Sequence, residues 1–236
     1  MRLDSYLVEN ALAPSRTKAA ELIKDGSVSV DSKIIKKTSF EVADGSSVEV
    51  ADVELYVSRA ALKLKGFLPY LPWDISGLDA LDIGSSTGGF AQILLENNIK
   101  SVSCVDVGRD QLHESIRADE RVSVYESTDI RNFTSETRFD IVVCDVSFIS
   151  LNHIIDDIDR LASKYIVVLF KPQFEVGRDV KRDKNGVVKD DRAIYKSMIK
   201  FEDMCALMGW KMVAKELAII SGKDGNEEIC YGYIKD

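Results

Sequence analysis

From residue 78 onward, short apolar runs alternate with stretches of helical pattern, and this alternation limits the possible folds most strongly. The apolar runs occupy residues 78–83, 101–107, 122–125, 138–144 and 165–170, and helical patterns lie between them at 90–97, 111–118 and 151–163. Strands that alternate with helices form a parallel sheet with helices on both faces. A helix at 191–208 and strands at 212–219 and 229–234 are expected to close the sheet with an antiparallel pair. The sequence therefore predicts an α/β, doubly wound sheet.

The first fifty residues predict a small, separate α/β unit. Apolar residues recur at helical spacing over residues 3–8, and Ser15 is a suitable N-cap for a second helix at 16–24, which ends at Asp25-Gly26. Short strands are expected near residues 28–30, 33–35 and 47–50. So short a chain buries only a small core. We expect a first domain at residues 1–55, a linker at 56–62 and a larger domain at 63–236.

The chain is acidic overall, with a net charge of −8, but its basic residues are unevenly distributed. Residues 1–65 carry ten bases and ten acids, so the excess of acids belongs to the rest of the chain. Residues 14–37 hold six bases against three acids, and residues 171–196 hold eight against five. Because nucleic-acid binding depends on local positive surface, the net charge does not exclude RNA as a partner.

Composition and patterning argue against several other classes. The longest wholly apolar stretch, at 165–170, is far shorter than the roughly 20 residues of a membrane span, and the N-terminus lacks the pattern of a signal peptide. We expect a cytoplasmic protein without a membrane partner. The four cysteines form no Cys-x-x-Cys pair and are expected to be buried thiols. The two histidines are far apart in sequence, so no metal site is expected.

A glycine-rich turn follows the first strand of the predicted sheet, in the sequence DIGSSTGGF at residues 82–90. Ligands of doubly wound sheets bind at the carboxyl ends of the strands, where glycine lets the backbone approach them. No lysine follows the glycines, which excludes a P-loop. Asp106 ends the second strand, where an acid can accept hydrogen bonds from both ribose hydroxyls, and Asp129 is suitably placed for an adenine amino group. These features predict an adenosine-bearing cofactor.

Two further strand ends carry opposite charges. Asp145 follows the apolar residues 142–144, and Lys171 follows 167–170, with Pro172 directing the chain out of the sheet. Side chains that emerge from adjacent strands are expected to pair. The pair predicts either a functional site or a purely structural ion pair.

Several segments together resemble the TlyA/hemolysin A family. They are the glycine-rich turn, Asp106-Val107-Gly108, the sequence DVSFIS at 145–150 and the sequence FKPQFE at 170–175. Arg2-Leu3-Asp4, Ser15-Arg16 and residues 24–30 are similar to a small RNA-binding domain, the alpha-L motif, shared with a ribosomal protein. The resemblance covers essentially the whole chain. It implies an S-adenosylmethionine-dependent ribosomal RNA 2′-O-methyltransferase with an FtsJ-like, Rossmann-like class I methyltransferase sheet.

The resemblance also implies site residues. The family's Lys-Asp-Lys-Glu catalytic set is matched by Lys63, Asp145, Lys171 and Glu228, although Ala60 and Ile229 depart from the residues usual beside it. The residues expected to bind the cofactor are Gly84, Ser85, Ser86, Thr87, Gly88, Gly89, Phe90, Asp106, Val107, Asp129, Ile130 and Asp145. Those expected to bind RNA are Arg2, Ser15, Arg16, Lys18, Lys24, Lys36, Lys37 and Arg59.

Methyl transfer to a ribose 2′-hydroxyl requires the oxygen to lose its proton as the new bond forms. Lys171 is expected to contact that oxygen and to assist the deprotonation, either as a base or as an electrostatic stabiliser. The resemblance implies a cytidine target in ribosomal RNA or in ribosomal subunits, and an effect on sensitivity to capreomycin-type antibiotics. The large subunit is favoured because the chain is short, with the small subunit as the alternative.

Three other functions remain open at this point. A ribosome-assembly factor would bind RNA without catalysis, and a methyltransferase for proteins or small molecules would not need the Lys-Asp-Lys-Glu set. A membrane-active hemolysin would need a spanning or strongly amphipathic cationic segment, which the sequence does not display. The sequence does not indicate the oligomeric state.

Overall fold

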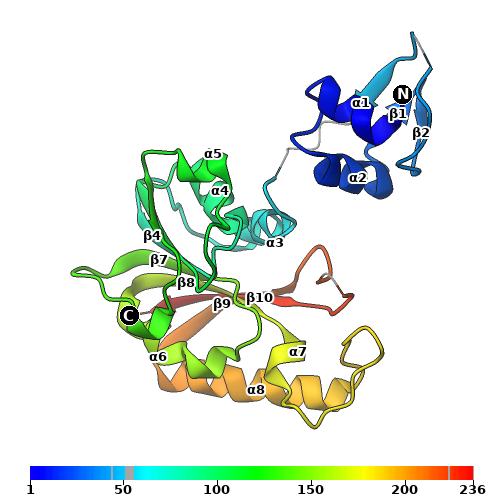
Figure 1. Ribbon diagram of the computed structural model, residues 1–236. Helices are drawn as coiled ribbons and strands as arrows, with labels where there is room; N and C mark the ends of the chain where they lie inside the picture. Colours follow the sequence, from blue (N-terminus) through cyan, green and yellow to red (C-terminus); the bar gives the residue numbers. More distant parts are fainter. Residues whose placement is uncertain (44, 51–55, 223, 236) are drawn as a thin grey trace. The chain divides into compact units, whose positions relative to one another are not determined.

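The chain divides into two compact units, Met1–Leu55 and Tyr56–Asp236 (Figure 1). The computed structural model describes residues 1–43, 45–50, 56–222 and 224–235, so the end of the first predicted domain, at 51–55, lies outside the described residues. No helix in these ranges is long and apolar enough to cross a lipid bilayer.

The first unit packs two helices against a small antiparallel sheet. The helices are α1 (Leu3–Glu9) and α2 (Arg16–Asp25), and the strands β1 (Val28–Val30), β2 (Lys33–Ile34) and β3 (Val48–Val50) lie in the order β2-β1-β3. As predicted, Ser15 caps α2 by accepting a hydrogen bond from the Lys18 amide, and Gly26 ends the helix in the left-handed conformation. A core that includes Leu3, Leu7 and Ile23 joins the two layers.

The second unit is built on a seven-stranded sheet in the order β6-β5-β4-β7-β8-β10-β9. Its strands are β4 (Asp79–Ile83), β5 (Ser101–Val105), β6 (Val122–Tyr125), β7 (Phe139–Cys144), β8 (Ala162–Phe170), β9 (Trp210–Leu217) and β10 (Ile229–Lys235). The strands from β4 to β8 are parallel, and β10 runs antiparallel to both β8 and β9. The predicted doubly wound sheet with a closing antiparallel pair is confirmed.

Helices cover both faces of this sheet (Figure 1). One face packs against α3 (Ala60–Phe67), α4 (Gly89–Glu96) and α5 (Glu114–Arg117), and the other against α6 (Ile155–Leu161) and α8 (Asp191–Leu207). Successive residues of β7 pack alternately into the hydrophobic cores on the two faces of the sheet. Ile141 and Val143 lie in the core under α3 and α4, and Val142 and Cys144 lie in the core under α6 and α8. Because both faces are buried, the strands read as continuous apolar runs. The remaining short elements are η1 (Leu68–Tyr70), η2 (Ile130–Asn132), η3 (Leu151–His153) and α7 (Pro172–Glu175).

Two predicted helices are shorter than expected. The pattern at 111–118 forms a helix only from Glu114, because the Glu126 carboxylate accepts the backbone N–H groups of Asp110, Gln111 and Leu112 and holds them in a loop. The pattern at 151–163 is divided between η3 and α6, and β8 begins at Ala162. Apolar residues at the end of a helix and at the start of a strand leave the same signal in a sequence.

Candidate active site

The glycine-rich turn follows β4. From β4 the sheet continues to β5 and β6 on one side and to β7 and β8 on the other, so the strand order reverses at β4. Gly84 has a φ of +78°, and a Cβ atom there would lie 2.9 Å from the Asp145 carbonyl oxygen. The turn therefore requires glycine, both for its backbone conformation and for its close approach to the loop after β7. Gly88, with a φ of +92°, packs below Leu112 instead, where an added Cβ would come within 2.8 Å of a methyl group.

Two adjoining cavities open at this edge of the sheet. The larger one has a volume of about 540 Å³, and the smaller one, of about 180 Å³, shares Gly84, Ser86, Asp145 and Ser147 with it. The predicted cofactor residues that line the larger cavity are Gly84, Ser86, Asp106, Val107, Asp129, Ile130 and Asp145. Those that line the smaller one are Gly84, Ser85, Ser86, Thr87, Gly89, Phe90 and Asp145. Gly88 lines neither cavity.

Asp106 lies in the wall of the larger cavity and connects two of its turns. Its carboxylate accepts the backbone N–H of Ser86 at 2.8 Å and that of Gly108 at 2.7 Å. Asp129 lines the same cavity, but its carboxylate pairs with Arg131 at 2.5 Å. Hydrogen bonds from Arg131 lower the pKa of Asp129 to about 2, so this carboxylate is charged at neutral pH.

Asp82 carries a buried carboxylate at the base of the smaller cavity. It is fully buried, and one of its oxygens accepts the Ala91 amide at 3.0 Å. Its other oxygen has no hydrogen-bond partner among the described residues. Burial raises the pKa of Asp82 to about 8, with a further contribution from nearby Asp145. A ligand that brings a cationic N–H donor to this oxygen would favour the ionised carboxylate and supply the missing hydrogen bond.

The four predicted catalytic residues form two ion pairs. Lys171 Nζ lies 2.5 Å from an Asp145 oxygen, and Lys63 Nζ lies 2.5 Å from a Glu228 oxygen. Lys63, Lys171 and Glu228 are all less than a tenth exposed. Since isolated charges are costly to bury, each cation requires its carboxylate partner.

Strand register explains how these residues meet. Asp145 and Lys171 directly follow the neighbouring parallel strands β7 and β8, as the sequence predicted. Glu228 precedes β10, which is antiparallel to β8 and pairs Ile229 with Phe170, so Glu228 lies beside Lys171 at the same edge. Lys63 reaches this edge from α3. Gln173, two residues after Lys171, donates a hydrogen bond to the Glu228 carboxylate at 3.3 Å.

The sequence did not single out three residues beside the catalytic set. The Ser147 hydroxyl accepts a hydrogen bond from Lys171 at 2.9 Å, and Gln173 contacts Glu228 as described above. Phe148 lines the larger cavity yet is 91% exposed, has a φ of +66°, and packs its ring 5.2 Å from that of Phe174. A left-handed, exposed phenylalanine is unusual. The available signal was their place in the two segments that carry the family resemblance, DVSFIS at 145–150 for Ser147 and Phe148 and FKPQFE at 170–175 for Gln173.

The predicted RNA-binding residues fall into two groups. In the first unit, Arg2 and Arg16 pair with the buried Asp4, and Ser15 serves as a helix cap. Lys24, Lys36 and Lys37 are exposed, and Lys18 is half-buried beside Glu21. Arg59 belongs to the second unit, where it donates to the Ser221 carbonyl at 3.1 Å.

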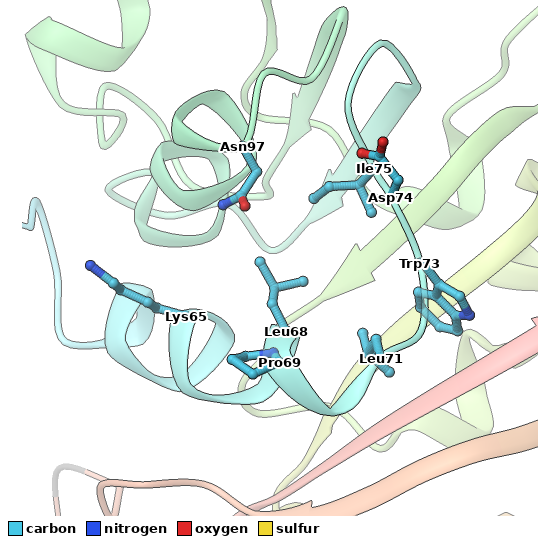
Figure 2. A pocket seen from close by; sticks show the side chains of 8 residues that line it. All are labelled: Lys65, Leu68, Pro69, Leu71, Trp73, Asp74, Ile75 and Asn97. Carbon is cyan, nitrogen blue, oxygen red and sulfur yellow. The ribbon is translucent and has the colours of Figure 1, made fainter.

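A further cavity, of about 400 Å³, adjoins the segment that leads into the amino end of β4 (Figure 2). Its lining is Lys65, Leu68, Pro69, Leu71, Trp73, Asp74, Ile75 and Asn97. It contains none of the predicted site residues, and the carboxyl ends of the strands, where the glycine turn lies, are at the other edge of the sheet.

Comparison with known proteins identifies the family of both units. Residues 56–234 match the model of the FtsJ-like methyltransferases, and residues 1–48 match the S4 domain. The chain belongs to the TlyA/hemolysin A family of FtsJ-like methyltransferases. It is thus an S-adenosylmethionine-dependent methyltransferase with an N-terminal S4 domain, as the sequence resemblance implied.

Relatives match over nearly their whole length. The 23S rRNA (cytidine-2′-O)-methyltransferase TlyA of Campylobacter jejuni is 46% identical, with 100% of both chains covered. The 16S/23S rRNA (cytidine-2′-O)-methyltransferase TlyA of Mycobacterium tuberculosis is 39% identical over 96% of this chain and 87% of its own. A solved hemolysin-type protein of Streptococcus thermophilus has a TM-score of 0.75 at 30% identity. Its alignment covers 100% of this chain and 88% of the solved chain.

The cavities fit the methyl donor of this family. S-adenosylmethionine supplies an electrophilic methyl group on a sulfonium. Its two ends differ, since one is an adenosine and the other an amino acid with a cationic ammonium. The unpartnered Asp82 oxygen in the smaller cavity suits the ammonium, and Asp106 in the larger cavity suits the ribose hydroxyls.

Proposed function

We propose that this protein transfers a methyl group from S-adenosylmethionine to the ribose 2′-hydroxyl of a cytidine in ribosomal RNA. The observation that carries the proposal is the buried Lys171–Asp145 ion pair in the lining of the smaller cavity, with the buried Lys63–Glu228 ion pair at the same edge of the sheet. A ribose hydroxyl is a weak nucleophile, and a positive charge held against its oxygen favours loss of its proton. The named activities of the Campylobacter and Mycobacterium relatives support this acceptor.

In this proposal each member of the catalytic set has its own task. As the new O–CH3 bond forms, the sulfonium C–S bond breaks and S-adenosylhomocysteine leaves. The 2′-proton passes to solvent water, while the Lys171 ammonium contacts the 2′-oxygen and stabilises the negative charge that develops on it. Asp145 and Ser147 fix the direction of the Lys171 ammonium through their contacts of 2.5 and 2.9 Å. Lys63 and Glu228 form a second buried ion pair at the same edge of the sheet, and Gln173 donates a hydrogen bond to Glu228. Positioning of this kind lowers the barrier because no charged group has to reorganise during the reaction.

We place the target in the large subunit. Support comes from the Campylobacter relative, which is named for 23S rRNA alone and matches this chain at higher identity than the relative named for both 16S and 23S rRNA. Methylation assays with separated small and large subunits test this choice. Equal incorporation into both subunits would contradict it.

The S4 domain supplies RNA affinity in this proposal. Replacing the exposed Lys24, Lys36 and Lys37 together by alanine is expected to weaken binding to large ribosomal subunits. Removing one lysine–phosphate interaction reduces the slope of log affinity against log salt by about 1, so a reduction of up to about 3 is expected. Binding measured over a salt series checks this. Affinity for S-adenosylmethionine should be unchanged, and so should RNA binding by the Lys164→Ala control. An unchanged salt slope would exclude these lysines as phosphate contacts.

Phe148 offers an exposed aromatic face at the mouth of the larger cavity. Chemistry at a nucleotide within folded RNA favours a nucleotide drawn out of its stack, and an aromatic ring can compensate part of the lost stacking. Phe148→Ala is expected to lower kcat/KM for RNA by about 5- to 150-fold, corresponding to a stacking contribution of about 1–3 kcal/mol. The affinity for S-adenosylmethionine should change little, and Phe148→Tyr should retain activity. Equal loss in the tyrosine and alanine variants would contradict a stacking role.

A further inference from the structure

We propose that Asp4 is a positioning residue for RNA binding, which holds Arg2 and Arg16 together as a two-arginine phosphate-binding fork. The inference rests on the proposed RNA-binding role of the S4 domain and goes beyond it by assigning a task to an acidic residue. Asp4 is the second residue of α1, and its side chain is only 7% exposed. A buried acid in a unit that binds an anionic partner calls for an explanation.

The contacts of Asp4 give that explanation. Arg2 donates to it through Nε at 3.0 Å and through Nη2 at 2.9 Å, and Arg16 donates through Nη2 at 2.9 Å. Both Nη2 atoms reach the same carboxylate oxygen, Oδ2. These hydrogen bonds lower the pKa of Asp4 well below its usual range, so it remains charged at any physiological pH.

The arrangement leaves both guanidinium groups available to a ligand. A guanidinium has five N–H donors in a fixed plane, and the bonds to Asp4 use two on Arg2 and one on Arg16. Among the residues that the structure describes, neither side chain donates to any other acceptor. Their side chains are 47% and 62% exposed, so the remaining donors can reach a phosphate.

Two elements bring the fork together. Arg2 precedes α1 and its backbone pairs with Glu41, whereas Arg16 is the first residue of α2. Without an anion between them, the two cations would repel each other and adopt many rotamers. Asp4 removes the repulsion and reduces the entropy lost when a phosphate binds.

A positioning role for Asp4 predicts that removing this acid weakens RNA binding. Removing an acid near bound phosphates normally strengthens RNA binding, or leaves it unchanged. Asp4→Asn is expected instead to weaken the binding of the full-length protein to purified large ribosomal subunits about tenfold near 0.1 M salt, since an amide cannot hold both guanidiniums. The control is Glu9→Gln, which removes the same charge from an exposed position on the same helix and should not weaken binding.

A mutant cycle separates this role from a structural one. In the Arg2→Ala/Arg16→Ala background, Asp4→Asn should cost little further affinity, whereas a loss of folding would weaken binding in either background. Binding by Asp4→Asn as tight as that of the wild type, while the double arginine variant is weakened, would overturn the positioning role alone. Unweakened binding by the double arginine variant would overturn the proposed RNA-binding role of these arginines as well.

Discussion

Replacing Lys171 by alanine is expected to reduce methyl transfer to ribosomal RNA by about a hundredfold to a thousandfold, the magnitude typical of losing a charge-stabilising group from an active site. The reason is geometric. Lys171 is buried in the lining of the smaller cavity, and its ammonium is directed by Asp145 and Ser147. Alanine removes the charge that stabilises the developing 2′-oxyanion and leaves Asp145 without its partner.

The affinity for S-adenosylmethionine distinguishes the loss of a catalytic group in Lys171→Ala from a general loss of folding. Calorimetry should give a dissociation constant within about threefold of the wild-type value for Lys171→Ala, since Lys171 is not expected to contact the methyl donor's adenosine. Lys164→Ala provides a matched control, because Lys164 lies on β8, the strand that Lys171 directly follows, but is exposed. Its activity should be unchanged. A Lys171→Ala protein that loses cofactor affinity and activity to the same degree would contradict the catalytic role.

Replacing Asp106 by alanine is expected to weaken S-adenosylmethionine binding about a hundredfold. Two effects contribute. The carboxylate is the proposed acceptor for the ribose hydroxyls, and hydrogen bonds to a charged group each contribute about 1.5–3 kcal/mol. It also accepts the Ser86 and Gly108 amides, so its loss releases two turns of the cavity wall.

Calorimetric titration with S-adenosylmethionine measures this effect, and RNA binding provides the contrast. Asp106→Ala should still bind large ribosomal subunits as the wild type does, because the S4 domain is unaltered. Glu114→Ala, which removes an exposed acid from α5, should bind the cofactor normally. Cofactor binding by Asp106→Ala within about threefold of wild type would place the ribose elsewhere.

Much of the fold of the second unit could be predicted from local sequence patterns. Apolar runs buried on both faces predicted the parallel strands, and polar residues at their carboxyl ends predicted the site edge. The limits of α5 and α6 did not follow, because they depend on tertiary contacts. The Glu126 carboxylate that shortens α5 comes from the loop after β6, and hydrophobic periodicity does not record such a contact.

The site itself was predictable to different degrees. Adjacent strands made the Asp145–Lys171 pair readable from sequence. Lys63 and Glu228 are separated by 165 positions, and only family resemblance connected them before the structure showed their ion pair. The unpartnered oxygen of Asp82 could not be foreseen, since satisfaction of a buried polar group depends on the full packing around it. Phe148 was missed because its exposure and left-handed backbone are properties of the folded loop.

The most direct test of the proposed function uses labelled S-adenosylmethionine with purified small and large ribosomal subunits from a strain that lacks the modification. The Lys171→Ala protein is assayed in parallel, and the labelled nucleotide is located by mass mapping. We expect label on the ribose 2′-oxygen of a cytidine in the large subunit's RNA, and no label with the variant. Label on a base or on protein, or no label from a protein that binds the cofactor normally, would contradict the proposal.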